Sequence, residues 1–276
     1  MRQIQYKWLG KDWVLTVHPL GDAVCDMFQP PSAMALLPWL LAEGKGTFVD
    51  VGAHVGTFAI HAASFFAEVV AFEPEARNLV CLKQNIRQNK IPNFTLIPWA
   101  VSDSCGVSTF FITETIDTGR NSLLPMAGGK SVEVQTVSIE SMFSSELSKH
   151  PPIAFVKIDV EGFEPKVIKG AAAIIDQQKI KPVMHVEFTP AKWAKQEADV
   201  YWLFEYLSAN NYVPFIPASG FIAPVTFDVI KQIYESWKTL RHDAWLDLTF
   251  IPAERSSQEH IMDAWGRACQ IVEKLH

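Results

Sequence analysis

The sequence predicts an α/β protein whose core is a doubly wound, mostly parallel sheet with helices on both faces. Short apolar strands alternate with amphipathic helices from Thr47 to Ile251, and no linker interrupts this rhythm. Strands joined by helices run parallel, and their crossover helices cover both faces of the sheet. A glycine-containing turn also joins the first of these strands to its helix, at residues 50–57. Such turns lie at the edge where open α/β sheets bind ligands.

The residues before the sheet, 1–45, are predicted to form an N-terminal extension packed on a single domain, residues 46–276. Alternation around Gly10-Lys11-Asp12 predicts a hairpin whose buried face carries Trp13, Leu15 and Val17. A helix is predicted over residues 32–43 and ends at Gly44, because glycine readily adopts the left-handed conformation that ends helices.

The elements of the sheet follow in chain order. Strands are predicted at residues 48–51, 69–72, 94–97, 153–158, 183–188, 212–216 and 246–251. Helical spacing of apolar residues predicts five helices. The first carries Phe58, Ala62 and Phe65, and the second carries Leu79, Leu82 and Ile86. The third covers residues 164–175, the fourth carries Val200, Leu203, Phe204 and Leu207, and the last carries Ile261, Trp265, Ala268 and Val272. Residues 104–137 break the rhythm and predict two antiparallel strands, 107–112 and 132–137, around a loop at residues 119–122.

Composition and charge exclude several classes of function. The chain has 276 residues with 24 basic and 30 acidic side chains, and its net charge of −6 disfavours a generally basic surface for nucleic acid. The longest apolar run, residues 33–42, is interrupted by Pro38 and is too short to span a membrane, and the first residues lack the apolar core of a secretory signal. We therefore expect a cytoplasmic protein without nucleic-acid or membrane partners. Cysteines 25, 81, 105 and 269 lack metal-binding spacing and are expected to be scattered buried thiols.

The strongest motif is the turn Asp50-Val51-Gly52-Ala53-His54-Val55-Gly56-Thr57. Its glycines allow a ligand to approach the backbone, but the spacing is not the GxGxxG of nicotinamide-binding proteins. A dinucleotide places an anionic pyrophosphate at the helix N-terminus, whereas Asp50 suits a cationic cofactor such as S-adenosylmethionine. The alternative interpretation is a tight turn without a ligand.

Glu73 is a second candidate, because it follows the second strand at the same edge of the sheet. A carboxylate there can accept hydrogen bonds from both hydroxyl groups of a ribose. Alternatively, Glu73-Pro74 only begins the next helix, since acidic residues stabilise a first helical turn.

The order of these motifs resembles that of the FkbM-type methyltransferases. The similarity spans residues 46–190, becomes more diffuse to Phe250, and is carried by Phe48-Val49-Asp50-Val51-Gly52-Ala53, Ala71-Phe72-Glu73-Pro74, Ala100-Val101-Ser102-Asp103, Lys157-Ile158-Asp159-Val160-Glu161-Gly162-Phe163-Glu164, Gly170 and Glu187. The resemblance implies a class I methyltransferase fold with a seven-stranded sheet, the last strand antiparallel, and S-adenosyl-L-methionine as cofactor. It also implies methylation of a hydroxyl group on a sugar, a polyketide or a similar small molecule.

The resemblance assigns cofactor contacts residue by residue. Asp50, Gly52, His54, Gly56 and Thr57 would line the methionine end, Glu73 would hold the ribose, and Trp99, Ala100 and Ser102 would lie near the adenine. His54 departs from the family, which usually has asparagine at this position. An ordinary turn histidine is an equal alternative to a functional role for His54.

Acidic residues at the ends of later strands are candidates for the chemistry. Asp159, Glu161 and Glu187 are predicted catalytic residues that would take the proton of the acceptor, and Asp159 would also face the cationic cofactor. His54 and His185 are alternative bases, and Glu161 could instead be only part of a turn. Because His185 and Glu187 lie two apart on a strand, they share a face and could join Asp159 in a metal site, but the spacing does not require a metal and none is predicted.

The acceptor is predicted to be a small molecule that contacts Arg120, Asn121 and His185, although a surface turn at 120–122 is an open alternative. Two other functions remain as alternatives: a nicotinamide-dependent oxidoreductase, and a non-catalytic nucleoside-binding protein on the same fold. The oligomeric state is left open.

Overall fold

The computed structural model describes residues 1–8, 11–17, 46–113, 118–125, 129–218, 221–240, 244–257 and 259. Two predictions concern residues outside this set: the helix at 32–43 and the tail helix with Ile261 to Val272. Cys25 and Cys269 also lie outside it. Of the described cysteines, Cys81 is buried as expected, whereas Cys105 is exposed because it lies in the turn that enters the insertion.

The centre of the fold is a sheet of eight strands in the order β12-β11-β13-β10-β9-β3-β4-β5. Five consecutive strands, from β10 to the edge strand β5, are parallel: β3 (Thr47–Val51), β4 (Glu68–Phe72), β5 (Phe94–Ile97), β9 (Ile153–Ile158) and β10 (Val183–Phe188). Strand β13 (Leu246–Pro252) pairs antiparallel with β10 and with β11 (Tyr212–Ala218). The predicted α/β fold with its mixed sheet is therefore confirmed. The short edge strand β12 (Phe221–Pro224), which pairs with β11, was not predicted.

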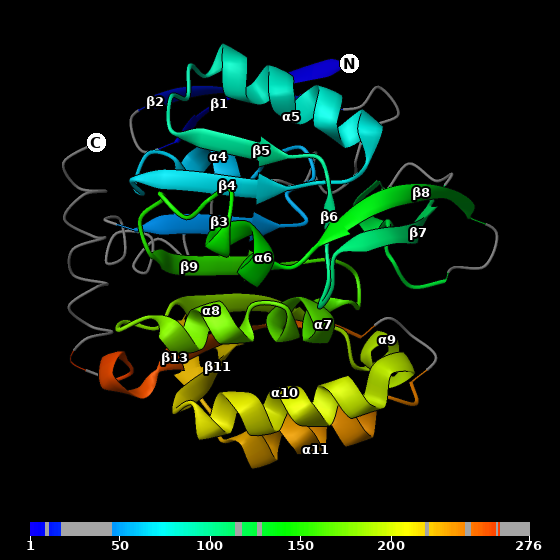
Figure 1. Ribbon diagram of the computed structural model, residues 1–276, viewed down its shortest axis with the longest axis vertical. Coiled ribbons are helices and arrows are strands. Elements are labelled where there is room, and N and C mark those ends of the chain that lie inside the picture. The colour runs from blue at the N-terminus through cyan, green and yellow to red at the C-terminus, as the bar shows by residue number, and fades with distance from the viewer. Residues whose placement is uncertain are drawn as a thin grey trace.

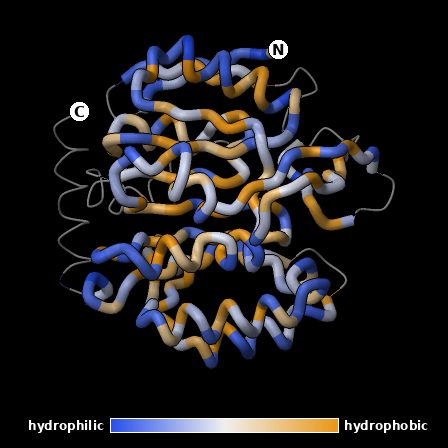
Figure 2. Tube along the Cα trace, viewed as in Figure 1, coloured by the Kyte–Doolittle hydropathy of each residue, from blue (hydrophilic) through white to orange (hydrophobic). Residues whose placement is uncertain are grey.

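Alternating side chains of the strands form two apolar layers. Val49 and Val51 of β3 face one layer, and Phe48 faces the other, because successive residues of a strand point to opposite faces. The first layer is covered by α6 (Ile139–Ser144), α7 (Glu164–Lys169), α8 (Ala172–Gln177), α10 (Glu197–Ala209) and α11 (Phe227–Trp237). The second is covered by α4 (Ala59–Ala62), α5 (Ala76–Gln88) and the N-terminal hairpin. Apolar residues concentrate along the strands accordingly (Figure 2).

Two predicted helices differ from the observed ones. The helix expected over 164–175 is divided into α7 and α8 at Gly170. A Cβ on Gly170 would lie 2.2 Å from the Ser102 carbonyl oxygen, so this glycine allows the helix to pass close to the insertion. The helix that carries Phe58, Ala62 and Phe65 is only four residues long, Ala59–Ala62. The remaining helical segments are α9 (Pro190–Trp193) and the 3-10 turns at Thr118–Arg120, Ala194–Gln196 and Ala253–Arg255.

The insertion forms a separate sheet of three strands beside the carboxyl ends of the parallel strands (Figure 1). As predicted, β7 (Gly106–Ile112) and β8 (Lys130–Val137) are antiparallel. Strand β6 (Ala100–Val101) adds to β8 in parallel orientation. Since β6 directly follows β5 of the main sheet, the insertion is tied to the edge where a ligand is expected.

The N-terminal hairpin, β1 (Arg2–Trp8) and β2 (Lys11–Val17), packs on α5 and α4. Asn85 of α5 accepts a hydrogen bond from the Thr16 N–H at 2.6 Å, and the Tyr6 hydroxyl lies 2.7 Å from His61 Nε2. His61, predicted to be a core residue, is 1% exposed. Lys11 and Asp12 belong to the second strand rather than to the turn. Within the described part of the chain, no helix is long and apolar enough to cross a membrane.

Candidate active site

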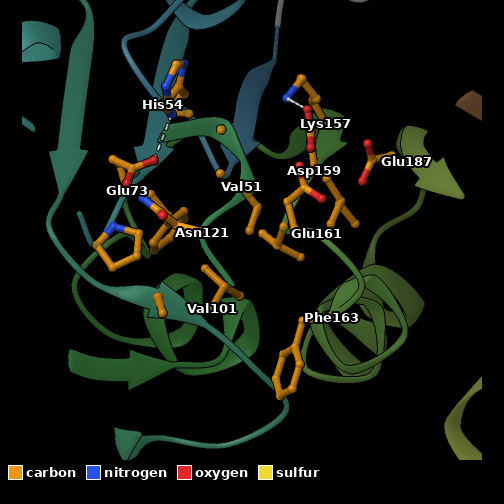
Figure 3. Close-up of a pocket in the computed structure, with 18 of the residues that line it drawn as sticks. Val51, His54, Glu73, Val101, Asn121, Lys157, Asp159, Glu161, Phe163 and Glu187 are labelled. Atoms are coloured by element: carbon orange, nitrogen blue, oxygen red, sulfur yellow. Dashed lines mark hydrogen bonds and ion pairs between the residues drawn. The ribbon is translucent and has the colours of Figure 1, made fainter. Parts of the chain in front are cut away.

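A cavity of about 530 Å³ lies at the carboxyl ends of β3, β4, β9 and β10 (Figure 3). This volume is within the range of about 300–1,000 Å³ that is usual for small-molecule sites. Its wall includes most of the residues singled out from the sequence: Gly52, His54, Thr57, Glu73, Trp99, Ala100, Arg120, Asn121, Asp159, Glu161, His185 and Glu187. The wall does not include Asp50, Gly56 or Ser102.

The turn after β3 has the conformation that its residues favour. Gly52 has a φ of 82°, and a Cβ there would lie 1.9 Å from the Asp159 carbonyl oxygen, so only glycine fits. His54 has a φ of 54°, in the left-handed region where asparagine and histidine are enriched. Histidine therefore fits the backbone conformation that this turn requires. The conformation directs the His54 N–H toward Glu73 Oε2, at 2.8 Å.

Glu73 is a fixed, buried carboxylate on the cavity wall. It is 4% exposed and accepts hydrogen bonds from the N–H groups of His54 and Glu75, both at 2.8 Å, and from Asn78 Nδ2 at 3.4 Å. Burial raises the pKa of Glu73, while these partners and the charge of His54 act in the opposite direction. The N-cap of α5 is Glu75, which accepts from the Asn78 N–H, so Glu73 itself is not the helix cap.

Asp50 lies behind the wall rather than on it. It is 1% exposed, and its Oδ1 lies 3.7 Å from Lys157 Nζ, whose side chain does line the cavity. Asp50 was predicted to line the methionine end of the cofactor, but it is not part of the cavity wall, where its ion-pair partner Lys157 lies instead. Burial raises the pKa of Asp50, and Lys157 partly offsets this effect.

Gly56 and Ser102 also lie outside the cavity wall, where they contribute to packing. A Cβ on Gly56 would lie 2.4 Å from Leu82 Cδ1, so this glycine allows α5 to approach the turn. Ser102 is 6% exposed, and its N–H donates to the Val137 carbonyl within the insertion.

Lys157 is the main residue that sequence reasoning missed. Its Nζ donates to Asp159 Oδ2 at 3.1 Å and lies 4.9 Å above the Phe58 ring. Burial disfavours its charge, yet the carboxylates of Asp159 and Asp50 prevail and raise the pKa of Lys157. A signal was present in the sequence: a lysine inside an otherwise apolar strand has to find a partner when it is buried. Strand register supplies it, because Asp50 pairs with Lys157 across β3 and β9.

Three carboxylates gather at the other end of the cavity. One oxygen each of Asp159, Glu161 and Glu187 lies within 4.8 Å of the others, which is close enough to hold a divalent cation. Lysines neutralise two of them, because Lys157 pairs with Asp159 and Lys192 with Glu161.

Glu187 differs from the other two acids. Its Oε2 is shielded from solvent and has no hydrogen-bond partner among the described residues. Burial, together with the charges of Asp159 and Glu161, raises the pKa of Glu187 well above its ordinary value.

Glu161 reaches this cluster through a left-handed turn, with a φ of 60°, followed by Gly162 with a φ of 105°. Glu164, which begins α7, stabilises the turn by accepting hydrogen bonds from the N–H groups of Val160 and Gly162. The turn after β9 therefore places Glu161 in the acidic cluster.

His185 lies in the wall beside Lys157, its neighbour across β10 and β9. Its Nδ1 is 3.1 Å from Thr249 Oγ1, and its Nε2 is 3.9 Å from Asp247 Oδ2. Burial lowers the pKa of His185, so the neutral ring is favoured. The wall also contains residues that sequence reasoning did not single out, among them Thr189, Lys192, Trp245 and Asp247.

Five parallel strands with a glycine turn and buried acids at their carboxyl ends, continued by an antiparallel strand, define a class I methyltransferase fold. The Methyltransferase FkbM domain matches residues 50–214, which is more than half of the chain. The chain therefore belongs to the FkbM methyltransferase family, as the sequence motifs indicated. This assignment leaves the nicotinamide oxidoreductase alternative without support.

Several known proteins are similar to this chain. The hexuronic acid methyltransferase AglP of Haloferax volcanii is 32% identical over 131 residues, which are 47% of this chain and 51% of that protein. The solved FkbM methyltransferase of Methylobacillus flagellatus KT has a TM-score of 0.46 and 16% identity, covering 75% of this chain and 44% of its own. The O-methyltransferase of Bacillus cereus, solved in complex with SAH, has a TM-score of 0.45 and 11% identity, covering 83% and 86%. This chain thus spans about half the length of the first two proteins.

Proposed function

We propose that this methyltransferase transfers a methyl group from S-adenosyl-L-methionine to a hydroxyl group of a sugar-type small molecule. The observation that carries the proposal is a single cavity with two chemically different ends. One end presents the buried carboxylate of Glu73, and the other presents Asp159, Glu161 and Glu187. A nucleoside cofactor suits the first end, and an acceptor that must lose a proton suits the second.

The first end fits a nucleoside without phosphate. Glu73 is held by two backbone N–H groups, which leaves its remaining acceptor capacity to ribose hydroxyls. The turn at Gly52 exposes backbone to the cavity, and the wall nearby is apolar, with Phe72, Val101 and Phe110. When bound, S-adenosyl-L-methionine would supply an electrophilic methyl group on a cationic sulfur.

Glu187 is the general base in this proposal. Its free Oε2 takes the proton of the acceptor hydroxyl while that oxygen becomes methylated. A raised pKa makes a carboxylate a stronger base, and a base is most effective when its pKa lies near the working pH. Asp159 and Glu161 are paired with lysines, and in this proposal they bind and orient the acceptor. His185 is the alternative base.

Two features of the cavity and one similarity support a sugar as the acceptor. Trp245 is 60% exposed although it lines the cavity, so its indole is available to stack on a sugar ring. Arg120 and Lys192, the latter paired with Glu161, line the same cavity and place positive charge along it. The similarity to a hexuronic acid methyltransferase favours a uronic acid residue in this place.

The test is transfer of a labelled methyl group from S-adenosyl-L-methionine to p-nitrophenyl glucuronide, with the matching glucoside for comparison. We expect transfer to the glucuronide, and a fall in kcat of about 100-fold or more in Glu187→Gln, the usual contribution of a general base. The matched control is Glu235→Gln, which removes an exposed carboxylate on α11 and should leave the rate unchanged.

Two results would contradict the proposal. Equal rates in the wild-type protein and Glu187→Gln would remove Glu187 from the chemistry. Tight binding of S-adenosylhomocysteine without methyl transfer to any sugar hydroxyl would instead favour a non-catalytic nucleoside-binding protein.

A further inference from the structure

Asn121 carries a buried amide that no part of the proposed reaction uses. Its side chain is 8% exposed and lines the cavity. Its Oδ1 accepts a hydrogen bond from the Thr113 N–H at 2.8 Å, while its Nδ2 has no partner among the described residues. Because a backbone N–H can only donate, the atom that faces Thr113 must be the oxygen, and the amide nitrogen faces away from it. A buried donor without a partner is costly, and a bound ligand is one explanation for it.

The position of Asn121 is fixed by the residues on both sides of it. Ser122 exchanges two backbone hydrogen bonds with Phe111, at 2.8 and 3.1 Å. The Ser122 hydroxyl donates to the Glu161 carbonyl oxygen at 3.0 Å and so ties this segment to the turn after β9. Asn121 is thereby held against the cavity by its own Oδ1 and by its neighbour, which makes its Nδ2 a preorganised donor.

Asn121 and Glu73 line the same cavity. In the view of Figure 3 they lie on one side of Val51, whereas Asp159, Glu161 and Glu187 lie together on the other side. The sequence predicts that Asn121 contacts the acceptor, but this placement favours the other ligand. An adenine ring presents acceptor nitrogens at its edge, and a fixed donor beside an apolar wall is complementary to them.

We propose that Asn121 Nδ2 donates a hydrogen bond to the nucleoside part of the methyl donor, so that the insertion, residues 104–137, forms part of the cofactor site. This inference rests on the proposed function, because it takes S-adenosyl-L-methionine as the cofactor. The motifs that carry the resemblance to the family lie outside residues 104–137. The inference therefore gives the insertion a part in cofactor binding that those motifs do not indicate.

The experiment measures calorimetric affinities for two probes that need no acceptor. S-adenosylhomocysteine contains the nucleoside and the amino-acid portion, and 5′-methylthioadenosine keeps the nucleoside only. In Asn121→Asp, the Thr113 N–H keeps its acceptor, but the donor is lost. We expect the affinity for both probes to fall by the same factor, about five- to tenfold. Asn121→Ala removes the donor without adding charge and should weaken both probes equally.

The matched control is Gln135→Glu, which makes the same change from amide to carboxylate on an exposed residue of β8, outside the cavity. It should leave both affinities unchanged, and thermal unfolding checks that each variant is folded. Affinities within twofold of the wild-type value in both Asn121 variants would overturn the inference. So would a loss for S-adenosylhomocysteine alone, because Asn121 would then face the amino-acid portion. A wild-type protein that binds neither probe would refute the proposed cofactor itself.

Discussion

The substitution Lys157→Met tests how much the buried ion pair of Lys157 and Asp50 contributes to the stability of the fold. It removes the cation but leaves Asp50, which is 1% exposed and has Lys157 Nζ at 3.7 Å. Removal of one partner from a buried pair costs about 3–5 kcal/mol, because the other charge remains in the interior. At about 2–4 °C per kcal/mol, the midpoint of thermal unfolding should fall by about 10 °C at neutral pH.

The cost should depend on pH in a direction that the burial of Asp50 determines. Burial raises the pKa of Asp50 in the folded protein, and the loss of Lys157 raises it further. A carboxyl group with a raised pKa destabilises the fold above that pKa, and the fold recovers when the group is protonated. The difference in unfolding free energy between the wild-type protein and Lys157→Met should therefore shrink as the pH falls.

Urea unfolding at several pH values measures this difference. Addition of Asp50→Asn to Lys157→Met should restore much of the lost stability, because no unpaired charge then remains. The control is Lys169→Met, whose partner Asp199 keeps Lys166, so its expected cost is below about 1 kcal/mol. If Lys157→Met costs no more than Lys169→Met, or if Asp50→Asn restores nothing, the ion-pair reasoning is wrong.

Three further predictions concern the cofactor end and the hairpin. Glu73→Gln should weaken S-adenosylhomocysteine binding about tenfold or more in calorimetry, because charge-assisted hydrogen bonds are worth about 1.5–3 kcal/mol; unchanged affinity would refute the ribose role. Gly52→Ala should abolish that binding or the fold, judged by circular dichroism, since its Cβ would lie 1.9 Å from a carbonyl oxygen; a folded, binding variant would contradict this. Burial lowers the pKa of His61 from 6.5 to about 4, so folding favours the neutral ring. This shift contributes about 3 kcal/mol to the free energy of unfolding; the contribution is present above pH 6.5 and is lost as the pH falls toward 4. His61→Asn should flatten that part of the stability profile, and an unchanged profile would argue against this assignment.

Local patterns determined most of the secondary structure of this protein. Each predicted strand of the main sheet is present, because short apolar runs between turns have few alternatives to a buried strand. The same local information located Gly52 and Glu73 at the edge of the sheet, since both directly follow strands. Helix lengths were less predictable: the division at Gly170 depends on the close approach of Ser102, which is distant in sequence.

The tertiary structure decided which of the candidate residues meet. Strand register pairs Lys157 with Asp50, and Lys157 rather than Asp50 lines the cavity, which no spacing along one strand reveals. Gly56 serves the packing of Leu82, although it is the last glycine of the motif. Asn121 reaches the cavity that Glu73 also lines only because the insertion folds back beside the sheet. Sequence patterns report which residues prefer to be buried or to end a strand, but distances between segments are set by pairing and packing, and these distances determine charge balance and hydrogen bonding in the site.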